Sequence, residues 1–331
     1  MQSFVPLACE YRGDLLDLTH MGYVCVVDEH SNVVLHLGDP QAKVFYRSAS
    51  KPIQALPAIA RRLDEAYGLT EEETALFAGS HAGEPFHLAA LSSLFQKAGL
   101  EESWMVMNPA VPAAAYANEE RIRQGLPPRK FYHNCAGKHA SLLLLQRALG
   151  APVQSYWRMD APAQQEVLRC VSILSECPQE QISLGIDGCG VPVFAVPLRC
   201  MATSFKNLAR PDRIRDEALS QAAARFVPRI HRHPLMIRGT GYRCSRLNED
   251  ENIVTKGGSL GVQCIGLKRE GLGIAIKLVD GTEDVLPLVI RRVFELLGYN
   301  KPETLRALDE LRPTSMLNDC SMQASLLRPA F

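Results

Sequence analysis

The chain has 331 residues, of which 47% are hydrophobic and 22% are charged, so it is long enough to bury a sizeable core. Its 36 basic and 36 acidic side chains cancel, and no block of like charges occurs, which argues against nucleic acid or an anionic membrane as a partner. No stretch approaches the roughly 18 uncharged apolar residues of a membrane helix. The N-terminal segment also lacks the basic and apolar regions of a secretory signal. We therefore expect a cytoplasmic protein whose ten cysteines are buried or ligating side chains rather than a disulfide framework.

The first part of the chain predicts antiparallel strands followed by helices. Residues 23–27 and 33–37 are rich in β-forming side chains and flank a hydrophilic segment suited to a hairpin turn. Apolar residues at helical spacing predict a helix over 53–67, and the same helical spacing of apolar residues continues over 71–77 and 86–98. Residues 105–134 are rich in Pro, Ala and Asn, and we interpret them as a long ordered loop with a short helix.

The rest of the chain predicts more helices and a return to strands. Helical patterns occur at 136–149, 161–175, 214–226 and 283–297. Strand patterns occur at 182–186, 191–196, 253–255, 262–267 and 273–278. Strands near both ends of the chain that enclose a helical middle indicate an α+β fold, in which the terminal segments pair into one antiparallel sheet. We expect a single catalytic domain over 1–331, with a helical subregion at about 50–230 inserted between the sheet-forming ends.

Ser48 and Lys51 match the Ser-x-x-Lys pattern of serine acyl-transferases, whose spacing brings a hydroxyl and an amine to one face of the first turn of a helix. A neutral lysine there can accept the serine proton. The pattern is short, and the alternative is that Ser48 or Ser50 only caps the helix that begins near Ile53. Pro52 disfavours α geometry at Lys51, so the spacing argument requires a tight turn.

Two further segments carry residues of the same chemistry. Ser80 lies in a turn of small residues at 79–85, where the backbone can face a ligand. Lys256 lies at a strand end before two glycines, as does the lysine on the edge strand of penicillin-recognising serine enzymes. Taken singly, Ser80 is also explained by a helix end and Lys256 by a solvated charge at the end of a strand.

A second constellation contains cysteine and histidine. Cys135 and His139 lie within one short segment, and Asp187 and Cys189 lie in a glycine-rich turn. Thiolates, imidazoles and carboxylates are all zinc ligands, although the sequence has no Cys-x-x-Cys pair and no His-Glu-x-x-His motif. The alternatives are two buried cysteines beside glycine-rich turns, or Cys135 as a nucleophile with His139 as its base.

Taken together, five segments resemble the Rhizobium-type L-asparaginase family, in the same order and over most of the chain. They are RSASKPIQALP at 47–57, GSHAGEP at 79–85, HNCAGKHA at 133–140, DGCGVP at 187–192 and TKGG at 255–258. The resemblance implies a fold similar to serine β-lactamases and serine-dependent glutaminases, and a homodimer. It also implies hydrolysis of L-asparagine to L-aspartate and ammonia.

The same resemblance assigns residues to roles. It implies two catalytic pairs, which are Ser48 with Lys51 and Ser80 with Lys256. It implies a zinc ion with three protein ligands, which are Cys135, Lys138 and Cys189. The residues expected to bind the substrate are Arg47, His139, Asp187 and, in a glycine-rich turn at 239–244 that resembles the family's turn loosely, Cys244.

The mechanism expected from these assignments is nucleophilic. Lys51 takes the proton of Ser48 as Ser48 attacks the side-chain amide carbon, and Ser80 relays a proton to the leaving ammonia. Two alternatives remain open. A serine-dependent glutaminase or a β-lactam hydrolase would use the same residue types. A non-catalytic, zinc-stabilised amino-acid-binding protein would use the serines as helix caps and the cysteines as structural ligands.

Overall fold

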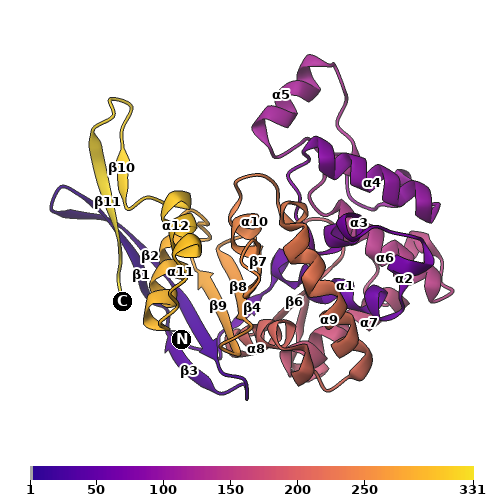
Figure 1. The fold of residues 1–331 in the computed structure, drawn as a ribbon, viewed down its shortest axis with the longest axis horizontal. Coiled ribbons are helices and arrows are strands. Elements are labelled where there is room, and N and C mark those ends of the chain that lie inside the picture. The colour runs from indigo at the N-terminus through magenta and orange to yellow at the C-terminus, as the bar shows by residue number, and fades with distance from the viewer. Residues whose placement is uncertain (1–2) are drawn as a thin grey trace.

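The computed structural model describes residues 3–331 and contains two antiparallel sheets. The larger sheet has eight strands in the order β10-β11-β1-β2-β9-β8-β7, with β3 paired to β2 (Figure 1). Its strands are β1 Val5–Arg12, β2 Leu15–Val27, β3 Val33–Leu37, β7 Ile253–Gly258, β8 Val262–Leu267, β9 Leu272–Leu278, β10 Ser315–Leu317 and β11 Gln323–Pro329. The smaller sheet has the order β4-β6-β5, with β4 Lys43–Phe45, β5 Ser183–Ile186 and β6 Pro192–Pro197.

Most helices lie between β4 and β7 in the sequence, and two more follow β9. Their bounds are α1 Lys51–Ala60, α2 Leu63–Ala66, α3 Glu71–Ala75, α4 Pro85–Ala98, α5 Ala115–Arg123, α6 Ala136–Ala148, α7 Pro162–Ser175, α8 Leu198–Ala209, α9 Glu217–Arg232, α10 Arg243–Asn248, α11 Leu286–Leu296 and α12 Pro302–Leu311. None of the helices in the described part of the chain combines the length and apolar character needed to cross a bilayer.

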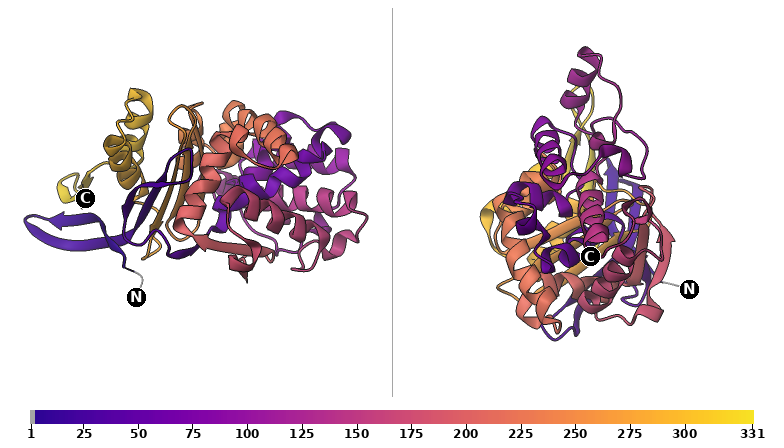
Figure 2. Two further views of the ribbon diagram at one scale, coloured as in Figure 1. Left: turned by 90° about the horizontal axis from the view of Figure 1, so that it is seen from below. Right: turned by 90° about the vertical axis from the view of Figure 1, so that its right-hand side faces the viewer.

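The larger sheet separates two hydrophobic cores. Helices α11 and α12 cover one face of the sheet and form one core with it, while α8 and most of the other helices form the second core on the opposite side (Figure 2). Helix α5 packs in a separate small cluster with Ala82. Helix α8 lies against β2, β8 and β9. A Cβ atom on Gly266 would lie 2.1 Å from the Phe205 carbonyl oxygen, and one on Gly273 would lie 2.1 Å from that of Ala202. The α8 backbone therefore touches the two strands at glycine, which fixes how the helical region sits on the sheet.

The predicted α+β fold is confirmed, including the pairing of terminal segments. Strand β1 near the N-terminus pairs with β11 near the C-terminus, so that Ala8 lies opposite Pro329. The predicted strands at 23–27, 33–37, 253–255, 262–267 and 273–278 all lie within the larger sheet. Strands β10 and β11 were not predicted from the sequence, because few of their residues are apolar and buried.

Two local expectations were wrong. The helix expected over 53–67 is interrupted after Ala60, because Arg62 adopts a left-handed conformation with φ of 53° and starts α2 anew. Lys51 has α geometry despite the proline that follows it, with φ of −57° and ψ of −41°. Pro52 lies in the first turn of α1, where its missing N–H group would have no partner within the helix.

The contact between α8 and the sheet gives a stability prediction. We expect Gly273→Ala to lower the free energy of unfolding by about 1–3 kcal/mol, because the new methyl group would overlap the α8 backbone. The matched control is Gly185→Ala in β5, whose added Cβ would meet its nearest atoms at an ordinary 3.4 Å. Urea unfolding of both variants measures the difference, and equal stability of the two would contradict the close packing.

Candidate active site

The turn that carries Ser48 lies directly against the edge strand β7. This turn is a short 3₁₀ helix, Arg47–Ser50, in which Arg47 has an unusual φ of 50°. The preceding residue, Tyr46, is anchored by its backbone N–H to the Phe194 carbonyl at 2.9 Å. A Cβ atom on Gly258 would lie only 2.3 Å from the Tyr46 carbonyl oxygen. Glycine at that position therefore lets the strand that carries Lys256 approach the turn that carries Ser48.

Lys51 is fully buried and points to the turn at 79–80. Its ammonium donates to the Gly79 carbonyl at 2.8 Å, to Ser80 Oγ at 2.9 Å and to the Asn134 carbonyl at 3.3 Å. Burial lowers the pKa of Lys51 from its ordinary value. Among the described residues no hydrogen bond joins Lys51 to Ser48. The contact that the structure shows thus connects the lysine of one expected pair with the serine of the other.

Lys256 is buried on β7 and has no acidic partner in the part of the chain that the structure describes. Its ammonium donates to the Gly257 carbonyl at 2.7 Å. Burial, aided by the nearby charges of Lys51 and Arg238, lowers the pKa of Lys256 to about 8. The Gly257 N–H group donates to Cys244 Sγ at 3.1 Å, which places Cys244 beside this lysine. A lysine of this pKa has an appreciable neutral fraction, about one tenth at pH 7, and the neutral form is the one that a base requires.

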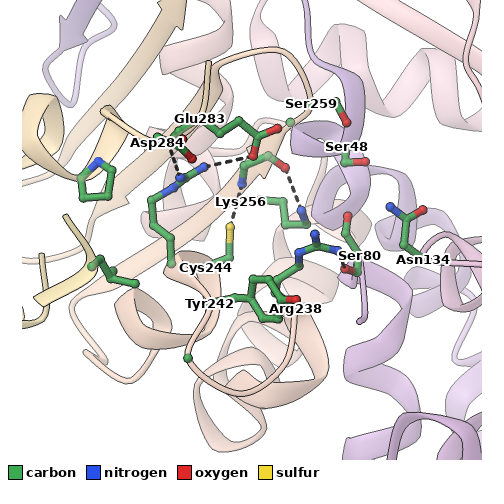
Figure 3. Close-up of a pocket in the computed structure, with 16 residues that line it drawn as sticks. Ser48, Ser80, Asn134, Arg238, Tyr242, Cys244, Lys256, Ser259, Glu283 and Asp284 are labelled. Atoms are coloured by element: carbon green, nitrogen blue, oxygen red, sulfur yellow. Dashed lines mark hydrogen bonds and ion pairs between the residues drawn. The ribbon is translucent and has the colours of Figure 1, made fainter. Parts of the chain in front are cut away.

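These groups converge on one cavity of about 300 Å³ (Figure 3). Ser48, Ser80 and Asn134 lie on one side of it, Cys244 lies on the other side with Lys256 reaching in between, and the Arg238 guanidinium extends to Ser80. Acidic side chains occur in the lining only at Glu283 and Asp284, which are exposed. The complete lining is Ser48, Ser80, Asn134, Arg238, Gly241, Tyr242, Arg243, Cys244, Lys256, Gly257, Gly258, Ser259, Glu283, Asp284, Pro287 and Leu311.

A segment that the sequence motifs did not identify holds Ser80 in place. The Ser80 N–H group donates to the Ile237 carbonyl at 2.8 Å, and the Arg238 guanidinium donates to the Ser80 carbonyl at 2.7 Å. The buried Glu84 carboxylate accepts hydrogen bonds from both the backbone and the hydroxyl of Thr240, each at 2.8 Å. Two consecutive residues, Ile237 and Arg238, thus bind the N–H group and the carbonyl group of Ser80. No local pattern in the sequence marks Arg238 or Glu84 for this role.

The expected substrate-binding residues Arg47, His139 and Asp187 lie outside the lining of this cavity. Arg47 Nε donates to Asp187 Oδ1 at 2.9 Å, and Arg47 lines a neighbouring, mainly apolar cavity. His139 Nδ1 lies 2.6 Å from the Tyr156 hydroxyl, while Nε2 has no partner among the described residues. Burial and the Lys138 charge hold the pKa of His139 well below its ordinary value. His139 is therefore a neutral imidazole behind the site.

The three expected zinc ligands come together in the structure. Lys138 Nζ lies 3.0 Å from Cys189 Sγ, and the Cys135 and Cys189 thiols are close enough to hydrogen-bond each other. That hydrogen bond lowers the pKa of Cys135 and raises the pKa of Cys189. Burial acts to lower the pKa of Lys138, but the two neighbouring sulfurs raise it above its ordinary value.

The donor atoms of these three side chains are of the kinds that bind zinc. Sulfur and nitrogen are the donors that Zn²⁺ prefers, and two converging thiols and one amine supply them. The set is uncommon because a lysine must lose its proton before it can bind a metal. The described residues contain no alternative cluster of three or more His, Cys, Asp or Glu side chains that could hold a metal ion.

A serine hydroxyl bonded to a buried lysine of lowered pKa, at a cavity lined by a second serine and a second such lysine, is an arrangement suited to hydrolases that use a nucleophilic serine. The family profile of L-asparaginase II matches residues 8–329 of this chain. The chain belongs to the L-asparaginase II family and is an asparaginase-like hydrolase. A search of the curated proteins gave no match.

The chain also matches solved structures at low sequence identity and low TM-score. A β-lactamase from Mycobacterium bovis has a TM-score of 0.43 and 14% sequence identity, over 83% of this chain and 94% of that chain. A Bacillus glutaminase has a TM-score of 0.40 and 13% sequence identity, over 84% of this chain and 91% of that chain.

Proposed function

We propose that this protein hydrolyses L-asparagine to L-aspartate and ammonia by covalent serine catalysis. The observation that carries the proposal is the hydrogen bond between Lys51 Nζ and Ser80 Oγ, in a cavity also lined by Ser48 and Lys256. Membership of the L-asparaginase II family supports the choice of substrate. The resemblance to that family also supports a homodimer, which stays a prediction, as does a cytoplasmic location.

In the proposed reaction Ser48 Oγ attacks the side-chain amide carbon of asparagine. The serine proton passes to a neutral lysine amine, and burial favours the neutral form of both Lys51 and Lys256. The tetrahedral intermediate collapses and the C–N bond breaks, while Ser80 gives its hydroxyl proton to the leaving amide nitrogen and regains a proton from the protonated Lys51 to which it is hydrogen-bonded, so that ammonia departs and the lysine is neutral again. Water then attacks the acyl ester, which releases L-aspartate and returns the proton to Ser48.

The predicted roles of Arg47, His139 and Asp187 in substrate binding stay predictions. Zinc is likewise a proposal, with Cys135, Lys138 and Cys189 as the residues that would hold it. A bound zinc ion would supply positive charge beside the cavity, which favours the negative charge that develops on an amide oxygen. This chain's own residues perform the proton transfers described above.

The assignment of the nucleophile is tested by alanine substitution. We expect Ser48→Ala to lower kcat for L-asparagine by at least about three orders of magnitude, because it removes the group that forms the acyl ester. Ammonia release from L-asparagine and L-glutamine, together with hydrolysis of a chromogenic β-lactam, defines the substrate class. Mass spectrometry of a quenched reaction locates the acyl group. A Ser48→Ala enzyme of near-native turnover, or an acyl group on Ser80, would reassign the nucleophile.

The pH dependence of the reaction follows from Lys256. Because the pKa of Lys256 is lowered to about 8, the neutral and active form increases as the pH rises through that value. We expect kcat/KM to fall about tenfold per pH unit below pH 8 and to level off above it. Lys256→Met should remove this acid limb together with most of the activity. An unchanged limb in the variant would assign the titration to another group.

Zinc binding is tested by metal analysis of purified protein. We expect wild-type protein to contain zinc and Cys189→Ser to lose it, because a hydroxyl is a poor substitute for a thiolate ligand. Cys170→Ser is the matched control, since Cys170 is equally buried but lies away from the cluster and bonds the Ile53 carbonyl. Equal zinc content in the two variants would refute the assigned ligands.

A further inference from the structure

Three cationic side chains line the cavity that contains Ser48, and they differ in their partners. Arg243 faces the Glu283 carboxylate at 3.6 Å and also donates to Gln263 Oε1 at 2.9 Å. Arg238 and Lys256 have no ion pair with any carboxylate in the described part of the chain. The cavity is also lined by Glu283 and Asp284, but neither forms an ion pair with Arg238 or Lys256, and a cation without such a partner is complementary to an anionic group of a ligand.

Arg238 is held in a fixed position at this cavity. One of its guanidinium nitrogens donates to the Ser80 carbonyl at 2.7 Å, and the guanidinium carbon lies 4.7 Å from the centre of the Tyr242 ring. A guanidinium has five N–H donors, and the contact with Ser80 is its one hydrogen bond among the described residues. Donors therefore remain for a ligand, on a side chain that loses little further freedom when the ligand binds.

The turn behind Arg238 is fixed as well. Gly239 has φ of 132°, and a Cβ atom there would lie 2.1 Å from Glu84 Oε1. Thr240 is bound to the Glu84 carboxylate through two hydrogen bonds, and Tyr116 donates to the same carboxylate at 2.6 Å. The Glu84 carboxylate thus bonds Thr240 and Tyr116 and forms no hydrogen bond or ion pair with Arg238 among the described residues.

Arg47 offers a useful contrast. Its Nε atom already donates to the Asp187 carboxylate at 2.9 Å, and it lines the neighbouring cavity rather than the one that contains Ser48. We propose that Arg238 binds the α-carboxylate of the substrate and selects amides that carry a free carboxylate. This inference rests on the proposed amidohydrolase function and names a specificity-determining residue for it. Arg238 would then connect substrate recognition with the position of Ser80.

The test compares L-asparagine with L-asparaginamide, in which a neutral carboxamide replaces the α-carboxylate. The main variant is Arg238→Gln, because a glutamine amide can still donate to the Ser80 carbonyl while the charge is lost. We expect kcat/KM for L-asparagine to fall about 10–100-fold, chiefly through a higher KM, as for the loss of a charged hydrogen bond. The value for L-asparaginamide should change little, so that the discrimination between the two substrates collapses.

Two further variants keep the outcome decisive. Arg243→Gln is the matched arginine control in the same cavity, because Arg243 already faces Glu283 and Gln263, and it should preserve the discrimination. Arg238→Lys retains the charge and should restore part of the discrimination that Arg238→Gln loses. The proposal is overturned if Arg238→Gln lowers kcat equally for both substrates, because Arg238 would then only position Ser80. Collapse of the discrimination in Arg243→Gln instead would also overturn it.

A binding measurement separates this proposal from the proposed activity. Calorimetric titration of Ser48→Ala with L-asparagine and with L-asparaginamide reports recognition without turnover. Binding of L-asparagine that is lost in Ser48→Ala/Arg238→Gln supports the role of Arg238, even if wild-type protein releases no ammonia. Turnover by wild type with unchanged binding in the double variant refutes the role of Arg238 alone. Absence of both binding and turnover refutes both proposals.

Discussion

The arrangement of the site depends on the close approach of strand β7 to the turn that carries Ser48. Glycine at position 258 allows this approach, since any side chain there would overlap the Tyr46 carbonyl oxygen. Lys256 lies two residues before Gly258, and Ser48 lies two residues after Tyr46, so one backbone contact brings both reactive groups to one cavity. Helix α8 packs on the larger sheet and touches β8 and β9 at glycine. It therefore holds the strands next to β7 against the helical region. Packing of backbone against backbone thus sets the geometry of the chemistry.

The buried lysines show how the fold distinguishes structural charge from reactive charge. Four lysines in residues 3–331 are almost completely buried, and only Lys206 faces a carboxylate, that of Glu176 at 3.3 Å. Lys138 lies against the Cys189 thiol, whereas Lys51 and Lys256 donate their hydrogen bonds to hydroxyl or carbonyl oxygens. Burial of a charge without a counterion is unfavourable, so such groups persist where the rest of the structure stabilises them and where a neutral amine has a use.

Much of the fold and the membership of the site could be predicted from the sequence, but its internal contacts could not. Runs of β-forming side chains at 23–27 and 33–37 on either side of a hydrophilic turn predict a pair of strands, and Ser48, Ser80 and Lys256 stand in recognisable motifs. Spacing alone favours a contact between Ser48 and Lys51, yet Lys51 bonds Ser80, because its side chain reaches across to a turn 29 residues away. Arg238 meets Ser80 over a separation of 158 residues. Such a contact arises from tertiary packing and leaves no local pattern.

The pairing of β1 with β11 has a consequence for how the chain folds during synthesis. The first strand to leave the ribosome can gain its outer neighbour only after the last residues have been made, and β2 must wait for β9. The helices between β4 and β7 are close in sequence and can form earlier, since local contacts close smaller loops. The growing polypeptide therefore carries an unfinished sheet with open edges through most of its translation. Chaperone protection of the nascent N-terminal strands would matter more for this protein than for one whose sheet is assembled from neighbouring segments.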